Sequence, residues 1–188
     1  MPNSNFQWQV PAEFNFANDV VDVWASDKDR VALIAINEAG NEQTYTYAEM
    51  AVASCKLANL LKNKGLKKGD RVVVMLPRIA DWQIAMVAVL RLGAVPIPCI
   101  TMLTEKDVTY RVQHSGAAGA ITMSEECAKF ADLADLESLT VKVCVGDAPN
   151  GWSSTAQAEK ENSEFAPVVV SSEEPAILYY TSGSTGAP

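Results

Sequence analysis

The chain is short of positive charge and of long apolar runs. Its 15 lysine and arginine residues stand against 23 aspartate and glutamate residues, a formal net charge of -8. Without a basic patch the phosphates of a nucleic acid would be repelled, which argues against a nucleic-acid-binding protein. The most apolar stretch is interrupted by Asp81, Gln83 and Arg91 before it is long enough to cross a bilayer. The sequence therefore predicts no membrane span.

The amino terminus carries no recognisable targeting segment. Met1 to Trp8 has neither the basic region nor the apolar region of a secretory signal. We therefore expect a cytoplasmic protein, and a removed organellar peptide is the alternative that the sequence leaves open.

Histidine and paired cysteines are also scarce. The single histidine, His114, has no carboxylate or thiolate at a spacing typical of a nucleophile and its base, so we expect it to stabilise a helix end. The cysteines lie in apolar stretches with no Cys-x-x-Cys pair and no histidine cluster nearby, and we expect four buried free thiols: Cys55, Cys99, Cys127 and Cys144. No catalytic or metal-ligating residue is assigned.

Length and patterning predict an α/β protein of one domain or most of one. The 188 residues are 48% hydrophobic, enough to bury about two-thirds of the surface of a folded chain. From residue 71 onward, short β-rich runs alternate with amphipathic stretches, which indicates a largely parallel sheet with helices on both faces. The expected strands of this sheet are 72–76, 94–99, 119–122, 141–145 and 176–180. Two earlier runs, 31–36 and 43–45, predict a small β-hairpin appendage.

Capping signals mark two of the helices. Thr46 and Glu49 form a capping box in front of an apolar stripe, and Gly65 stands where that helix should end. Thr104, followed by Asp107, predicts a second helix that runs to about residue 115. These local patterns place both helices against the sheet.

Two stretches are less regular. The helix expected over 79–92 is apolar on nearly every face, so we hypothesise that its outer side packs against protein beyond this chain and that the isolated chain self-associates. Residues 147–174 are polar and rich in turn formers, which predicts a long surface connection with one helical turn near 156–161.

The strongest functional signal is the end of the sequence. Six small residues follow the apolar run 176–180: Thr181, Ser182, Gly183, Ser184, Thr185 and Gly186. Glycine lets the backbone approach an anion, and hydroxyls donate further hydrogen bonds to its oxygens, so this loop predicts a phosphate cradle. It lacks the Gly-Lys-Ser/Thr ending of a Walker loop and the Gly-x-Gly-x-x-Gly of a dinucleotide turn. A flexible Ser/Gly-rich tail is the bland alternative.

The sequence from Tyr180 to Pro188 resembles the signature loop of the adenylate-forming enzymes, the acyl-CoA synthetases and their relatives. Upstream segments resemble the medium-chain acyl-CoA synthetase branch: Phe14 to Ala17, Leu76 to Trp82, Ile97-Pro98, Leu103 to Asp107 and Tyr110-Arg111. The resemblance covers nearly the whole chain, yet such enzymes are roughly three times as long. It implies that residues 1–188 are the N-terminal portion of the AMP-binding (adenylation) domain, without the rest of that domain or the small C-terminal domain.

The resemblance also implies an activity and its cofactors. Such an enzyme is an acid–thiol ligase: it joins a carboxylic acid to ATP as an acyl-adenylate, releasing pyrophosphate, and coenzyme A then displaces AMP. By motif alignment the phosphates fall to Thr181, Ser182, Gly183, Ser184, Thr185 and Gly186, with Thr181 near a magnesium ion. The lysine that follows the loop in the family, the acyl pocket and the adenylation lysine have no counterpart before Pro188. We therefore expect the 188 residues alone to be inactive.

A second hypothesis is a binding or dimerisation module that keeps the fold without the catalysis. It explains a chain that lacks the catalytic groups, but gives little reason for the loop to be retained. The identity of the acyl substrate and the oligomeric state are left open by the sequence.

Overall fold

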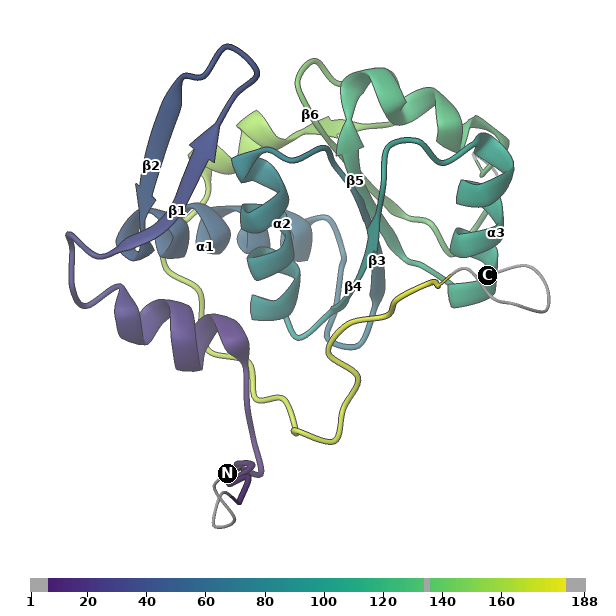
Figure 1. The fold of residues 1–188 in the computed structure, drawn as a ribbon. Coiled ribbons are helices and arrows are strands. Elements are labelled where there is room, and N and C mark those ends of the chain that lie inside the picture. The colour runs from purple at the N-terminus through teal and green to yellow at the C-terminus, as the bar shows by residue number, and fades with distance from the viewer. Residues whose placement is uncertain (1–6, 134–135, 182–188) are drawn as a thin grey trace, which may run out of the picture.

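A parallel β-sheet forms the centre of the molecule (Figure 1). The computed structural model describes residues 7–133 and 136–181. The described sheet has five strands in the order β4-β3-β5-β6-β7, and each strand pairs with its neighbours in parallel. Their bounds are Arg71–Met75 for β3, Val95–Cys99 for β4, Gly119–Met123 for β5, Val141–Val145 for β6 and Ser153–Ser154 for β7.

Helices cover both faces of this sheet, as predicted, because its strands alternate their side chains between two apolar cores. Val72 and Val74 of β3 face the core that contains α1 (Tyr47–Asn63) and α2 (Ala80–Arg91). Val73 and Met75 face the opposite core, which contains α3 (Glu105–Ser115) and the 3₁₀ helix η2 (Ser124–Leu133). Apolar runs buried on both sides are typical of parallel sheets. The predicted fold class is confirmed.

The predicted capping box of α1 is present, and the N-cap predicted for α3 is a capping box as well. The Thr46 hydroxyl accepts a hydrogen bond from the Glu49 amide at 3.2 Å, and the Glu49 carboxylate accepts one from the Thr46 amide at 2.8 Å. Thr104 and Asp107 make the same reciprocal pair at the start of α3. Because these contacts join residues three positions apart, the sequence alone was enough to locate them.

A two-stranded antiparallel hairpin stands beside the main sheet, as expected. It consists of β1 (Val31–Ile36) and β2 (Glu42–Thr46). A π-helix, η1 (Ala17–Asp22), packs with α1, α2 and the hairpin in a third small core. Figure 1 shows η1 and the hairpin on the α1–α2 side of the molecule.

The long connection after β6 contains the predicted helical turn but also a short strand that was not predicted. It contributes the two-residue strand β7 and the short 3₁₀ helix η3 (Thr155–Lys160), and then runs over the surface. The four cysteines are free and buried, as expected. Among the described residues, no helix is long and apolar enough to cross a membrane.

One predicted strand is absent: residues 176–180 are extended beside β4 but do not form a ladder with it. The Val95 amide donates to the Asp70 carbonyl, toward β3. The backbone carbonyl of the next residue, Pro96, therefore points away from β3. On this outer edge it accepts a hydrogen bond from the Leu178 amide at 3.1 Å. Pro96 and Pro98 have no N–H to donate on that edge, so the 176–180 segment finds acceptors but no matching donors there.

Candidate functional site

The predicted phosphate loop begins at the last described residue. Thr181 is exposed and directly follows the extended segment along β4. The other predicted site residues lie outside the described part of the chain: Ser182, Gly183, Ser184, Thr185 and Gly186. The structure therefore describes the contacts of the segment that leads to the predicted loop. This segment, residues 176–181, is here called the loop approach.

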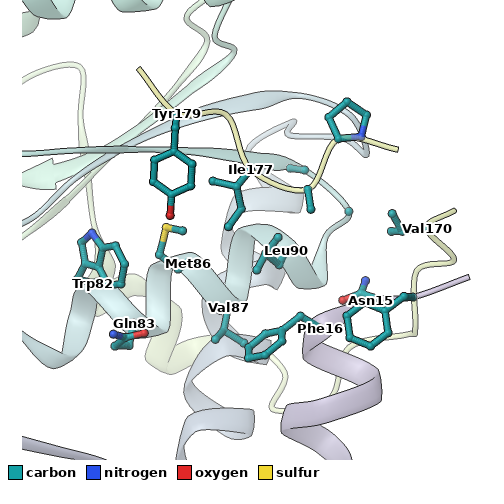
Figure 2. A pocket seen from close by; sticks show the side chains of 15 residues that line it. Asn15, Phe16, Trp82, Gln83, Met86, Val87, Leu90, Val170, Ile177 and Tyr179 are labelled. Atoms are coloured by element: carbon teal, nitrogen blue, oxygen red, sulfur yellow. The ribbon is translucent and has the colours of Figure 1, made fainter. Parts of the chain in front are cut away.

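The loop approach alternates its side chains between the two faces of the sheet. Leu178 and Tyr180 pack against the core that contains α3. Ile177 and Tyr179 point to the other side, toward α2, as Figure 2 shows. This period of two is what an extended backbone requires. The loop approach thus lies across the edge of the sheet with contacts on both faces.

On the α2 side, Ile177 and Tyr179 border an apolar groove of about 320 Å³. Figure 2 shows the Tyr179 ring directed at Met86 and Ile177 directed at Leu90. The remaining wall comes from Trp82 and from the N-terminal segment around Phe16. The N-terminal segment and the loop approach thus cover part of the outer side of α2, whereas the sequence led us to expect that protein beyond this chain covers it. The groove between them stays open.

The N-terminal wall of the groove is held by Asn15, which is buried. Its side-chain amide donates to the carbonyl of Arg91 at 3.3 Å and to that of Val168 at 3.1 Å. The neighbouring Phe14 amide donates to the Val170 carbonyl at 2.8 Å. These bonds tie the N-terminal segment to the end of α2 and to the strand-like stretch that precedes the loop approach.

On the α3 side, the loop approach is held by an aromatic cluster. The Tyr180 hydroxyl and Nδ1 of His114 are 2.8 Å apart. The imidazole stacks on Tyr110, with ring centroids 5.3 Å apart, and the edge of the Tyr180 ring meets both of these rings. The Arg111 guanidinium lies 5.3 Å from the centroid of the Tyr180 ring.

His114 therefore does more than the sequence indicated. It lies in the last turn of α3, as predicted, but its hydrogen bond reaches Tyr180, 66 positions away in the sequence. The Tyr110–His114 spacing of four residues signals a contact on one helix face. No sequence pattern connects that face to Tyr180.

Burial raises the pKa of the Tyr180 phenol above its ordinary value of 10, although a hydrogen bond with the Ser115 side chain and, to a smaller extent, the Arg111 charge oppose this shift. The phenol is therefore neutral at physiological pH and keeps its proton for a hydrogen bond. Burial also raises the pKa of Cys99 to about 11 and that of Cys127 to about 12, so neither thiol offers a thiolate nucleophile near neutral pH.

The described residues do not contain a cluster of three or more His, Cys, Asp or Glu side chains able to hold a metal ion. The carboxylate-rich site that Mg²⁺ prefers is thus not found in residues 7–133 and 136–181. Within that part of the chain, Thr181 is the residue that the resemblance places near the ion.

The family follows from comparison with known proteins. Residues 21–188 match the family described as AMP-binding enzyme. The chain belongs to the AMP-binding enzyme family. The resemblance noted from the sequence is thereby confirmed, and the predicted phosphate loop falls within the matched region, which covers most of the chain.

Two relatives among the AMP-binding enzymes illustrate the match. The chain is 39% identical over 190 residues to the human mitochondrial acyl-coenzyme A synthetase ACSM5, covering 95% of this chain and 33% of that protein. It is 32% identical over 179 residues to the uncharacterized acyl-CoA ligase YtcI of Bacillus subtilis, covering 95% of this chain and 34% of that one.

A solved structure shows the same fold. The acetoacetyl-CoA synthetase from Streptomyces lividans superimposes with a TM-score of 0.85 at 24% identity, over 97% of this chain and 30% of that one. The chain thus spans about a third of the length of the AMP-binding enzymes it matches.

Proposed function

We propose that this chain forms the N-terminal portion of the adenylation domain of an AMP-forming acyl-CoA synthetase. The observation that carries the proposal is the loop approach, which lies along the sheet edge and ends at Thr181, where the Ser/Gly-rich sequence begins, in a chain of this family. Relatives named as acyl-CoA synthetases or ligases support the reaction class.

The proposed reaction has two steps. A carboxylate oxygen attacks the α-phosphorus of ATP, forming an acyl-adenylate and expelling pyrophosphate. The thiol of coenzyme A then attacks the acyl carbon, forming a thioester and releasing AMP. The medium-chain branch is proposed from the upstream sequence segments, and the acid itself is a question of pocket shape.

Charge is the main obstacle to the first step, because an anionic carboxylate must approach an anionic triphosphate. In the proposed mechanism the loop amides and the hydroxyls of Thr181, Ser182, Ser184 and Thr185 hold the β- and γ-phosphates, and Gly183 and Gly186 let the backbone come close. Magnesium, when bound, would neutralise part of the phosphate charge. With a net charge of -8 the chain itself supplies little of that neutralisation.

We propose that the 188 residues alone do not adenylate. The family resemblance places the loop lysine, the adenylation lysine and the acyl pocket after the loop. We keep the cytoplasm as the proposed location, although the ACSM5 relative is named as mitochondrial.

The test of phosphate binding compares hydroxyl variants in the product of the gene's full reading frame. Removing one hydroxyl that bonds a charged oxygen costs about 1.5–3 kcal/mol, roughly ten- to a hundredfold in affinity. We expect Ser184→Ala and Thr181→Val to raise the KM for ATP by such factors. Ser163→Ala, an exposed serine on the surface connection, is the control and should leave it unchanged. Equal behaviour of all three variants would refute the phosphate role.

A further inference from the structure

The loop approach has few backbone bonds to fix it. Within residues 176–181, the recorded backbone bond to the sheet is the Leu178 amide on the Pro96 carbonyl. The two prolines of β4 withhold the donors that a ladder would need. The position of Thr181 must therefore depend on side-chain contacts of its neighbours.

Tyr180, the residue directly before Thr181, makes the most specific of these contacts. Its hydroxyl lies 2.8 Å from Nδ1 of His114 and 3.4 Å from the carbonyl oxygen of Arg111. A separation of 2.8 Å is that of a well-formed hydrogen bond, whereas 3.4 Å is long. Tyr180 is partly buried. Its ring packs against the core that contains α3, and its hydroxyl contacts His114 on that helix.

The contact works with either role of the imidazole. When Nδ1 is unprotonated, the Tyr180 hydroxyl donates to it. When Nδ1 carries a proton, it donates to the Tyr180 oxygen, and the hydroxyl proton can turn to the Arg111 carbonyl. The link between α3 and the loop approach therefore does not require one protonation state of His114.

The helix that presents His114 is itself well fixed. Val108 and Val112 are buried in the core beneath it, and Thr104 caps its first turn. Gly116 closes the last turn with a left-handed φ of 61°. Tyr110 stacks on the imidazole from the preceding turn and limits its rotation.

We infer that His114 is a positioning residue for the phosphate loop: through Tyr180 it fixes the point at which the backbone leaves the sheet and starts the loop at Thr181. The inference rests on the proposed function, because it assigns His114 a task in ATP binding. His114 acts through Tyr180 and is not assigned any contact with the nucleotide.

The first experiment measures amide hydrogen exchange of the 188-residue chain over residues 176–181, the loop approach. His114→Phe and Tyr180→Phe each remove one side of the bond but keep a ring. Loss of this one exposed hydrogen bond should speed exchange of this segment by roughly two- to tenfold. His114→Asn places an amide where Nδ1 stood and should restore slow exchange.

Matched controls separate positioning from general destabilisation. Gln113→Ala changes an exposed neighbour on α3, and Tyr179→Phe removes the hydroxyl of the adjacent tyrosine on the opposite face. Both should exchange like the wild type. Exchange across Val108 and Val112 should stay the same in every variant. Unchanged exchange of residues 176–181 in both His114→Phe and Tyr180→Phe would overturn the inference.

The second experiment measures the KM for ATP in the product of the full reading frame. We expect His114→Phe and Tyr180→Phe to raise it by roughly two- to tenfold, as one lost hydrogen bond predicts, with His114→Asn near the wild type. Faster exchange without any change in this KM would overturn the positioning role while leaving the proposed function standing. A wild-type protein that neither binds nor uses ATP would overturn the proposed function and this inference together.

Discussion

The guanidinium of Arg91 and the carboxylate of Asp22 make two parallel hydrogen bonds, each 2.7 Å long. Arg91 is the last residue of α2. It is fully buried, with 0% of the residue exposed, whereas 39% of the Asp22 side chain is accessible. The buried hydroxyl of Ser54 accepts two further bonds from the same guanidinium, at 3.3 and 3.2 Å. One ion pair thus joins η1, α1 and α2.

Asp22→Ala should destabilise the fold because it leaves a buried guanidinium with only Ser54 as a side-chain partner. Breaking a fully buried pair costs about 3–5 kcal/mol, and the accessibility of Asp22 reduces this to about 2–3 kcal/mol. Urea unfolding followed by circular dichroism measures the change. Asp29→Ala, at an exposed position seven residues after the end of η1, removes the same charge and should change the free energy of unfolding by less than about 0.5 kcal/mol. Equal losses in the two variants would contradict the role of the pair.

The capping box of α3 predicts an acid-sensitive contact. Two hydrogen bonds from Thr104 lower the pKa of Asp107 below its ordinary value of 3.8. The bond from the Thr104 hydroxyl has the larger effect and the bond from the Thr104 backbone amide the smaller. Because the folded-state pKa is lowered, the stabilisation is present above that ordinary value and is lost as the pH falls through the folded-state pKa. Carbon-detected NMR titration should show the Asp107 pKa moving back up in Thr104→Val. In the control, Thr109→Val, the pKa should not move.

The local contacts in this fold were the predictable ones. The partners in Thr46–Glu49 and in Thr104–Asp107 are three residues apart. The start of each helix could therefore be located from the sequence alone. The Val-rich run of β3 predicted a buried strand because both of its faces are apolar. The parallel sheet, the hairpin and the helices on both faces followed from these patterns.

The contacts that shape the candidate site were not predictable in this way. Asp22 and Arg91 are 69 positions apart, and His114 and Tyr180 are 66 apart. Only the arrangement of the elements brings them together. The strand expected at 176–180 did not form for a similar reason. Its apolar composition is that of a strand, but pairing also needs backbone N–H donors on the neighbouring edge of β4, and Pro96 and Pro98 have none there.

The thiols should be inert in the native protein. Burial raises the pKa of each of the four cysteines, to about 11 for Cys99 and about 12 for Cys127. Thiolate, the reactive form, is therefore scarce at pH 8, and access is blocked as well. Ellman's reagent should find essentially no reactive thiol in the folded chain and four in denaturant. Fast labelling of a native thiol would show that the core opens readily.

The groove beside α2 predicts self-association of the 188-residue chain. Its lining is apolar and its border includes the exposed Ile177, and such surfaces tend to be covered by a partner. Sedimentation velocity should show a concentration-dependent increase in mass that Ile177→Lys reduces. Val52→Lys, an exposed apolar position on α1 outside the groove, is the matched control and should leave the association unchanged. A monodisperse wild-type monomer would contradict this prediction.

The central proposal is that this chain belongs to the carboxylate-activating part of an acyl-CoA synthetase and is not active by itself. The most direct test is carboxylate-dependent exchange of labelled pyrophosphate into ATP, with acetate, butyrate, octanoate and benzoate, for the 188-residue chain and for the product of the full reading frame. The account predicts exchange in the longer protein with at least one acid and none in the 188 residues. Exchange by the 188 residues, or by neither protein, would contradict it, and the second result would favour a binding or dimerisation module.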